Sequence, residues 1–196
     1  MLYYSNSLSM WVLTAIVLLI WFSSGRSFWN LGFGYPPPLA GQPLYIMLVF
    51  AVLYLIDFIA GLRSAETMSE ADKTTLAILP ANGQEYLHYV FVAFTAAVTE
   101  EILYRAYFIS YVISMAGTQA TGIGLSLLLP AIAFGVVHLY QGWKAVVKII
   151  AMAVFLGLVF LQLQNLWAVI AAHFLLDLVG GYARILLDKP FGKNKT

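Results

Sequence analysis

Long runs of apolar residues, separated by short polar stretches, recur along the whole chain. Most runs reach the roughly 20 residues that a membrane-spanning helix needs, and none alternates apolar and polar positions as a barrel strand does. We expect six such segments: Leu8–Phe22, Leu44–Leu62, Glu85–Met115, Thr121–Tyr140, Trp143–Leu163 and Trp167–Leu187. The pattern predicts an all-α fold, a polytopic membrane helix bundle of about six transmembrane helices.

The composition supports a membrane protein and excludes several other classes. Of the 196 residues, 62% are hydrophobic and 10% are charged, whereas a soluble domain is typically about half apolar and about a quarter charged. An ordinary soluble domain and a disordered chain are therefore excluded. The net charge of +1 offers no basic surface for nucleic acid. The chain has no cysteine, which excludes disulfides and a thiol nucleophile.

We expect one membrane domain with three parts. Residues 1–84 hold the N-terminal transmembrane helices and linkers, residues 85–187 hold most of the charged residues that lie within apolar segments, and residues 188–196 form a short cytoplasmic tail. The first apolar segment could instead be a signal peptide. No Lys or Arg precedes it and no clear cleavage site follows it, which favours a retained helix.

The placement of Lys and Arg predicts the orientation of the helices. If six helices span the bilayer, eight of the ten cations lie on the side that holds both termini, Arg26 alone lies on the other side, and Arg105 lies within the third segment. The eight are Arg63, Lys73, Lys144, Lys148, Arg184, Lys189, Lys193 and Lys195. Cytoplasmic loops carry the excess of positive charge. We therefore expect a multi-pass integral membrane protein with both termini in the cytoplasm.

Ionisable residues inside the apolar segments are the strongest indication of function. A charged residue at the centre of a membrane helix costs about 2.5–3.5 kcal/mol on insertion scales, so such residues cluster against one another or around water. Six of them, on the third, fourth and sixth segments, are candidates for such a cluster: Glu100, Glu101, Arg105, His138, His173 and Asp177. Their presence on three segments predicts one polar site where these helices meet.

The spacing along each helix suggests which of these side chains form pairs. Glu101 and Arg105 are four residues apart, with the acid first, which is the favourable order for an ion pair that carries both into the membrane. Glu100 lies about 100° around the helix from Glu101 and needs another partner or a wet cavity. His173 and Asp177 are also four residues apart and share a helix face.

These residue types are suited to hydrolysis. A carboxylate or an imidazole can accept a proton from water, and a second imidazole can donate to a developing oxyanion. Two histidines and two carboxylates could also bind zinc, for which the candidate ligands are Glu100, His138 and His173. The residues alone leave both mechanisms open.

Three motifs resemble the signature of the CAAX-protease and bacteriocin-processing family of intramembrane proteases. Glu-Glu-x-x-x-Arg stands at residues 100–105, Phe-x-x-x-His at 134–138 and His-x-x-x-Asp at 173–177. Their order and spacing match the family pattern, and the resemblance covers roughly residues 85–185. Residues 85–187 would then be the catalytic core.

The resemblance implies a glutamate-dependent intramembrane endopeptidase that acts on a membrane-anchored protein or peptide within the lipid bilayer. Glu100 would be the general base and would hold the attacking water together with His138. His173 and Asp177 would line the oxyanion side, while Glu101 and Arg105 would form a structural ion pair, with Phe134 as motif support. No metal or other cofactor is expected on this mechanism, and zinc is the alternative.

One position departs from the prenyl-protein members of the family. Those eukaryotic members carry Asn where this chain has Asp177. An Asn amide can donate to an oxyanion, whereas an ionised carboxylate cannot. Asp177 would therefore orient His173, stay protonated or support a metal. The difference also argues modestly against a substrate that must be prenylated.

Other functions remain as alternatives at this stage. A zinc-dependent version of the same hydrolysis and a non-catalytic membrane scaffold or immunity protein of the same fold both fit the sequence. A proton-coupled transporter would favour broken helices and internal symmetry, which the sequence does not show. The expected orientation also places His138 and His173 toward opposite membrane faces. For the site residues to meet, the helices must be tilted or offset, or the third must begin below the membrane.

Overall fold

The computed structural model describes residues 2–34 and 78–188, together with Tyr45, Leu48, Val49, Val52, Tyr54 and Ile56. The described chain is helical and contains no strand. Its α-helices are α1 (Leu2–Ser23), α4 (Gly83–Glu100), α5 (Ser110–Ala116), α6 (Ala120–Val137), α7 (Trp143–Leu163) and α8 (Leu166–Asp188). The shorter elements are the 3₁₀ helices η1 (Phe28–Leu31) and η3 (Leu139–Gln141) and the π-helix η2 (Glu101–Ile109).

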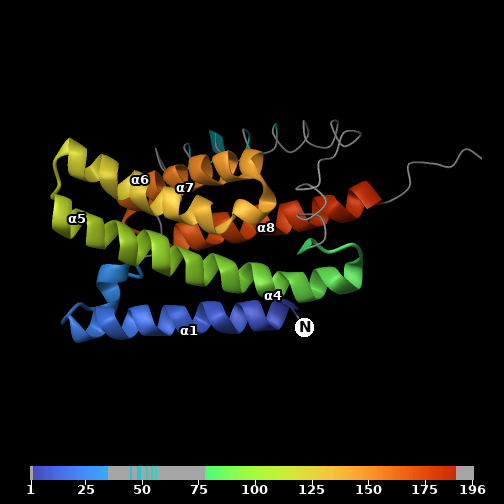
Figure 1. Ribbon diagram of the computed structural model, residues 1–196, viewed down its shortest axis with the longest axis horizontal. Helices are drawn as coiled ribbons and strands as arrows, with labels where there is room; N and C mark the ends of the chain where they lie inside the picture. The colour runs from blue at the N-terminus through green and yellow to red at the C-terminus, as the bar shows by residue number, and fades with distance from the viewer. Residues whose placement is uncertain are drawn as a thin grey trace, which may run out of the picture.

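One long helical path crosses the molecule and consists of α4, η2 and α5 in succession (Figure 1). It begins at Asn82, whose side chain accepts hydrogen bonds from the backbone N–H groups of Gln84 and Glu85. It ends at Gly117, whose φ of +81° suits a residue without a Cβ. The π-helical stretch lies at the middle of this path and starts at Glu101, within the first sequence motif.

Helices α6 and α7 form a closely packed antiparallel pair beside this long path (Figure 1). Gly135 makes the close approach possible, because a Cβ there would lie 2.4 Å from Cγ1 of Ile150. Small residues at a helix contact are the usual means of close packing in membranes. The contacts of α6 with α7 and with η2 therefore fix the end of α6, which His138 directly follows.

The remaining helices pack against α4, which has α8 on one side and α1 on another. The backbone N–H of Leu166, at the start of α8, donates a 2.7 Å hydrogen bond to the carbonyl of Gly32, directly after η1. This bond provides a partner for one of the N–H groups that a helix start leaves unpaired. It also joins the connection after α1 to the beginning of α8.

Large apolar side chains face outward and several polar side chains face inward. Leu8, Leu19 and Leu128 are exposed, for example, although each lies within an apolar helix. The buried polar residues are Ser7, Thr14, Thr95, Thr99, Glu101, Arg105, Ser126 and Asn165. A soluble protein rarely presents so much contiguous apolar surface, so this distribution fits a bundle that is surrounded by lipid.

The all-α prediction is confirmed for the described residues, and the number of membrane spans is confirmed only in part. Four described helices are long and apolar enough to cross a membrane: Tyr4–Ser23, Ala120–Val137, Trp143–Leu163 and Leu166–Leu186. The expected third span, Glu85–Met115, is helical but is not among these four. Most of the expected second span, Leu44–Leu62, and nearly all of the expected 188–196 tail lie outside the described residues. Six spans therefore remain a prediction.

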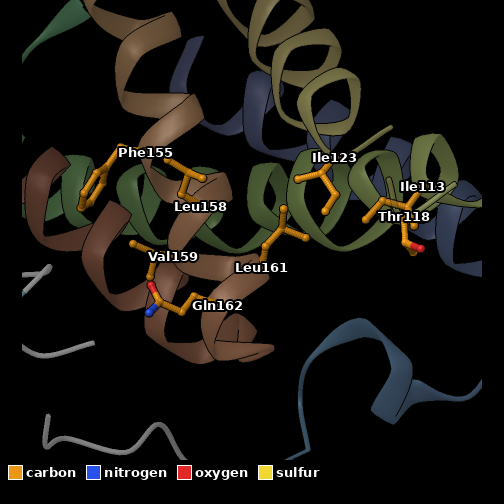
Figure 2. A pocket seen from close by; sticks show the side chains of 8 residues that line it. All are labelled: Ile113, Thr118, Ile123, Phe155, Leu158, Val159, Leu161 and Gln162. Carbon is orange, nitrogen blue, oxygen red and sulfur yellow. The ribbon is translucent and has the colours of Figure 1, made fainter. Parts of the chain in front are cut away.

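An apolar groove of about 530 Å³ opens between the end of α5, the start of α6 and the second half of α7 (Figure 2). Its lining residues are Ile113, Thr118, Ile123, Phe155, Leu158, Val159, Leu161 and Gln162. None of the residues in the three sequence motifs belongs to this lining. The groove and the polar cluster described next are therefore separate features.

Candidate functional site

The three motifs meet in the structure around the ring of Phe134. The junction of α4 and η2 contributes Glu100, Glu101 and Arg105, the end of α6 contributes Phe134 and His138, and the first half of α8 contributes His173 and Asp177. The six ionisable residues expected at one site thus come from three separate parts of the chain. Because His138 directly follows α6 while His173 lies within α8, the two helices are offset along their axes.

His173 lies at the centre of the carboxylates. Its Nδ1 donates a 2.7 Å hydrogen bond to Oε1 of Glu101. Its Nε2 lies 3.7 Å from Oε2 of Glu100 and 3.7 Å from Oδ2 of Asp177. The two ring nitrogens therefore have different roles: one is held by a direct hydrogen bond, and the other faces two carboxylates at ion-pair distance.

Glu101 and Arg105 form a buried pair within η2. Nη1 of Arg105 lies 2.9 Å from Oε1 of Glu101. The Arg105 side chain is 2% exposed and the Glu101 side chain is 0% exposed. The contact is an ion pair without good hydrogen-bond alignment, because neither terminal nitrogen of Arg105 has a well-aligned acceptor among the described residues. The Arg105 guanidinium carbon also lies 5.1 Å from the centre of the Phe134 ring, where the π face attracts the cation.

The hydrogen bond from His173 gives Glu101 a second contact that the sequence did not reveal. Spacing on one helix suggested a pair with Arg105 alone, since the position of α8 around that helix could not be known. In the structure the same carboxylate oxygen contacts both Arg105 and His173. Glu101 therefore connects the buried ion pair to the accessible part of the site.

His138 is oriented by the backbone of its own helix. Its Nδ1 donates a 2.7 Å hydrogen bond to the carbonyl of Phe134, so in the neutral ring Nε2 carries the lone pair. The ring centre lies 4.6 Å from that of Phe134, and the His173 ring meets Phe134 edge-on at 6.3 Å. In the described part of the chain, no hydrogen bond or ion pair joins His138 directly to Glu100.

Accessibility separates the cluster into two groups. The side chains of Glu100, His173 and Asp177 are 15%, 12% and 31% exposed, whereas Glu101 and Arg105 are sealed. The first three side chains are therefore partly accessible from outside the bundle. This division agrees with different roles for the two neighbouring glutamates.

Three tyrosines hold the turn of α8 that carries Asp177. The Tyr86 hydroxyl donates to the carbonyl of Leu178 at 2.9 Å. Tyr54 and Tyr89 donate at 3.2 Å each to the carbonyls of Leu176 and Asp177. Sequence reasoning missed this clamp, although Tyr86 and Tyr89 are three residues apart and so share a face of α4.

The zinc alternative has no preformed set of ligands in the described residues. No group of three or more His, Asp or Glu side chains is placed there to hold a metal ion. Glu100 and His173 approach each other, whereas among the described residues His138 is linked to His173 through the ring of Phe134.

Comparison with known proteins places these residues in a family. The model of the family described as type II CAAX prenyl endopeptidase Rce1-like matches residues 82–179, which is half of the chain and includes all three motifs. No curated protein and no solved structure matches the chain significantly. The match confirms the resemblance to the CAAX proteases, and with the four long apolar helices it indicates an integral membrane protein that acts on a protein substrate. The chain belongs to the Rce1-like family of type II CAAX prenyl endopeptidases.

Proposed function

We propose that this protein is an intramembrane endopeptidase that hydrolyses a peptide bond of a membrane-anchored protein or peptide, with water activated by Glu100 and His138. The observation that carries the proposal is the convergence of the three motifs on one partly accessible site around Phe134. The family match supports a protease. A substrate segment must lose its helical structure before cleavage, because a helix shields its own peptide bonds, and a wet site within the bundle allows this.

Glu100 and His138 are suited to activate water. The Glu100 carboxylate is accessible and forms no hydrogen bond with the described residues, so it can accept a proton. His138 uses Nδ1–H for the Phe134 carbonyl and leaves the lone pair of Nε2 to hold the water. The water oxygen would form the new bond to the scissile carbonyl carbon, its proton would pass to Glu100, and the π electrons would move to the carbonyl oxygen.

His173 and Asp177 would act on the other side of the scissile bond. With Nδ1–H committed to Glu101, only Nε2 faces the accessible side, and a proton there can donate to the oxyanion. Of the possible roles for Asp177, the 3.7 Å contact with Nε2 favours orientation of His173. The intermediate would then collapse as the C–N bond breaks and the proton on Glu100 passes to the leaving amine.

A cleavage assay in proteoliposomes tests this proposal. The substrates are membrane-anchored peptides, each made with and without a prenyl group, and Glu100→Gln and His138→Ala are compared with the wild type. We expect both variants to lose at least about 100-fold in rate, the scale of general acid–base catalysis. Glu85→Gln and His88→Ala are matched controls, because Glu85 caps α4 and His88 contacts Tyr4, both outside the site.

The same assay separates the alternatives. Cleavage that survives a strong chelator and requires Glu100 supports the glutamate mechanism. Cleavage that a chelator abolishes and zinc restores would establish the zinc-dependent version. A cellular phenotype that persists in both variants would identify a scaffold. Both termini in the cytoplasm are part of the proposal, supported by eight of the ten cations on one side of the expected topology.

A further inference from the structure

The hydrolysis proposed above lacks a neutral donor for the oxyanion. Asp177 replaces the amide that could donate, and an ionised carboxylate can only accept. Nε2 of His173 faces Glu100 and Asp177 at 3.7 Å each, so both carboxylates compete with the oxyanion for its proton. A negative charge that develops beside these groups needs a donor that carries no negative charge of its own.

Tyr104 is a neutral donor whose ring adjoins this site. It lies in η2, four residues after Glu100, and its ring meets Phe134 edge-on with centres 4.9 Å apart. The Phe134 ring also contacts His138 and His173. The charges of Glu100 and Arg105 act on the Tyr104 phenol, so this side chain belongs to the same electrostatic environment.

The Tyr104 hydroxyl makes no hydrogen bond with any residue that the structure describes. The tyrosines of the α8 clamp differ, since Tyr54, Tyr86 and Tyr89 each donate to a backbone carbonyl. Tyrosine hydroxyls within a protein interior usually have a partner. The Tyr104 ring is partly buried against Phe134, and its hydroxyl has no partner among the described residues that would compete with a ligand.

We propose that Tyr104 is a further catalytic residue, whose hydroxyl donates a hydrogen bond to the oxyanion of the tetrahedral intermediate. This role rests on the proposed endopeptidase activity. As the water oxygen bonds to the scissile carbon, the π electron pair moves to the carbonyl oxygen, and Tyr104 donates to that oxygen without giving up its proton. The hydrogen bond weakens when the carbonyl re-forms and the C–N bond breaks. Glu100 alone transfers the proton from the water to the amine.

Tyr104→Phe tests this role, because it removes the hydroxyl and keeps the ring against Phe134. We expect kcat to fall about 100-fold, the usual cost of losing one oxyanion donor, with KM and the melting temperature unchanged. Tyr107→Phe is the matched control on the same π-helix, since the Tyr107 ring packs against Trp21 and Tyr111 away from the site. A Tyr104→Phe variant with wild-type kcat, or with a change in KM alone, would overturn the proposal.

A second measurement separates donation from packing. Fluorinated tyrosine at position 104 keeps the shape of the ring and makes the hydroxyl more acidic, so it ionises and stops donating at lower pH. We expect the alkaline decline of kcat to move to lower pH. The other titratable and charged groups of the site stay the same in this comparison; they are Glu100, Arg105, His138, His173 and Asp177. An alkaline decline that stays in place would assign Tyr104 to packing and overturn the proposal.

Failure of this inference is distinguishable from failure of the proposed function. Cleavage that requires Glu100 but not the Tyr104 hydroxyl refutes the role of Tyr104 and leaves the endopeptidase in place. Cleavage by Glu100→Gln at the wild-type rate refutes the glutamate mechanism, and the role of Tyr104 falls with it.

Discussion

At the scale of single residues, the two adjacent glutamates illustrate how position divides one residue type into two roles. Glu100 is partly exposed and lies 3.7 Å from His173 Nε2, whereas Glu101 is sealed and binds Nδ1 of the same ring at 2.7 Å. A carboxylate that cannot meet water cannot activate it. On the proposed mechanism, Glu101 would act through His173 as a positioning residue, because its contact with Nδ1 fixes the tautomer and the orientation of the ring.

We predict that Glu101→Gln lowers both stability and activity. It leaves the Arg105 cation buried without a counter-charge, which typically costs about 3–5 kcal/mol. Thermal unfolding in detergent and the cleavage rate measure the two effects. The double variant Glu101→Gln with Arg105→Met removes the uncompensated charge, so the melting temperature should recover. Cleavage should stay low, because His173 keeps only a neutral acceptor. Recovery of both together would show that Glu101 serves the fold alone.

At the scale of elements, the tyrosine clamp explains Gly181, the second of the two glycines that follow Asp177 in α8. A Cβ at Gly181 would lie 2.4 Å from Cε1 of Tyr89, whereas one at Gly180 would lie 3.6 Å from the Tyr54 hydroxyl, an ordinary contact. The close approach of Tyr89 allows its hydroxyl to reach the carbonyl of Asp177. The clamp thus sets the position of α8 relative to α4, and with it the position of His173 relative to the two glutamates.

We predict opposite effects for alanine at these two glycines. Gly181→Ala displaces Tyr89, so it should destabilise the protein by about 1–3 kcal/mol and slow cleavage. Gly180→Ala should be neutral or stabilising by up to about 1 kcal/mol, since alanine is the better helix former. Melting temperatures and cleavage rates of the two variants decide the matter. Equal effects at both positions would contradict the role given to the clamp.

The helices and their motifs could be predicted to different degrees. Long apolar runs identified α6, α7 and α8 to within about three residues, because a membrane helix must be long and apolar. The start of α1 at Leu2 was missed by six residues, since Ser5, Asn6 and Ser7 interrupt the apolar run there. The start of α4 was missed by two residues, although Asn82 followed by Glu85 is a recognisable capping pattern. The contact between Glu101 and His173 could not be predicted, because spacing within one helix does not reveal how another helix is rotated against it.

At the scale of the whole molecule, the described bundle buries several polar side chains and leaves many large apolar side chains on its outer surface. An apolar outer surface fits the bilayer in either orientation, so the charges of the loops determine which end of the molecule faces the cytoplasm. If α6 spans the membrane, Gln119 before it and Gln141 after it lie on opposite sides. The excess of Lys and Arg predicts that Gln141 lies on the cytoplasmic side.

We predict that single cysteines at these positions react from opposite sides. The chain has no native cysteine, so Gln119→Cys and Gln141→Cys each introduce one unique thiol. In intact cells an impermeant thiol reagent should label the cysteine at 119 and reach the one at 141 only after permeabilisation. The reverse pattern would invert the topology. Equal labelling of both in intact cells would show that α6 does not separate two compartments.

The π-helical stretch has a consequence for how the chain tolerates change. Each π turn accommodates one residue more than an α turn, so the halves of the long helix on either side of Glu101–Ile109 are out of phase with a plain α-helix. Loss of one residue from this stretch would let it form α-helical hydrogen bonds, with a continuous helix on either side. The side chains inside the stretch, which include Glu101 and Arg105, would then turn relative to α6 and α8. Their contacts with Phe134 and His173 would change although the chain kept all its charged residues.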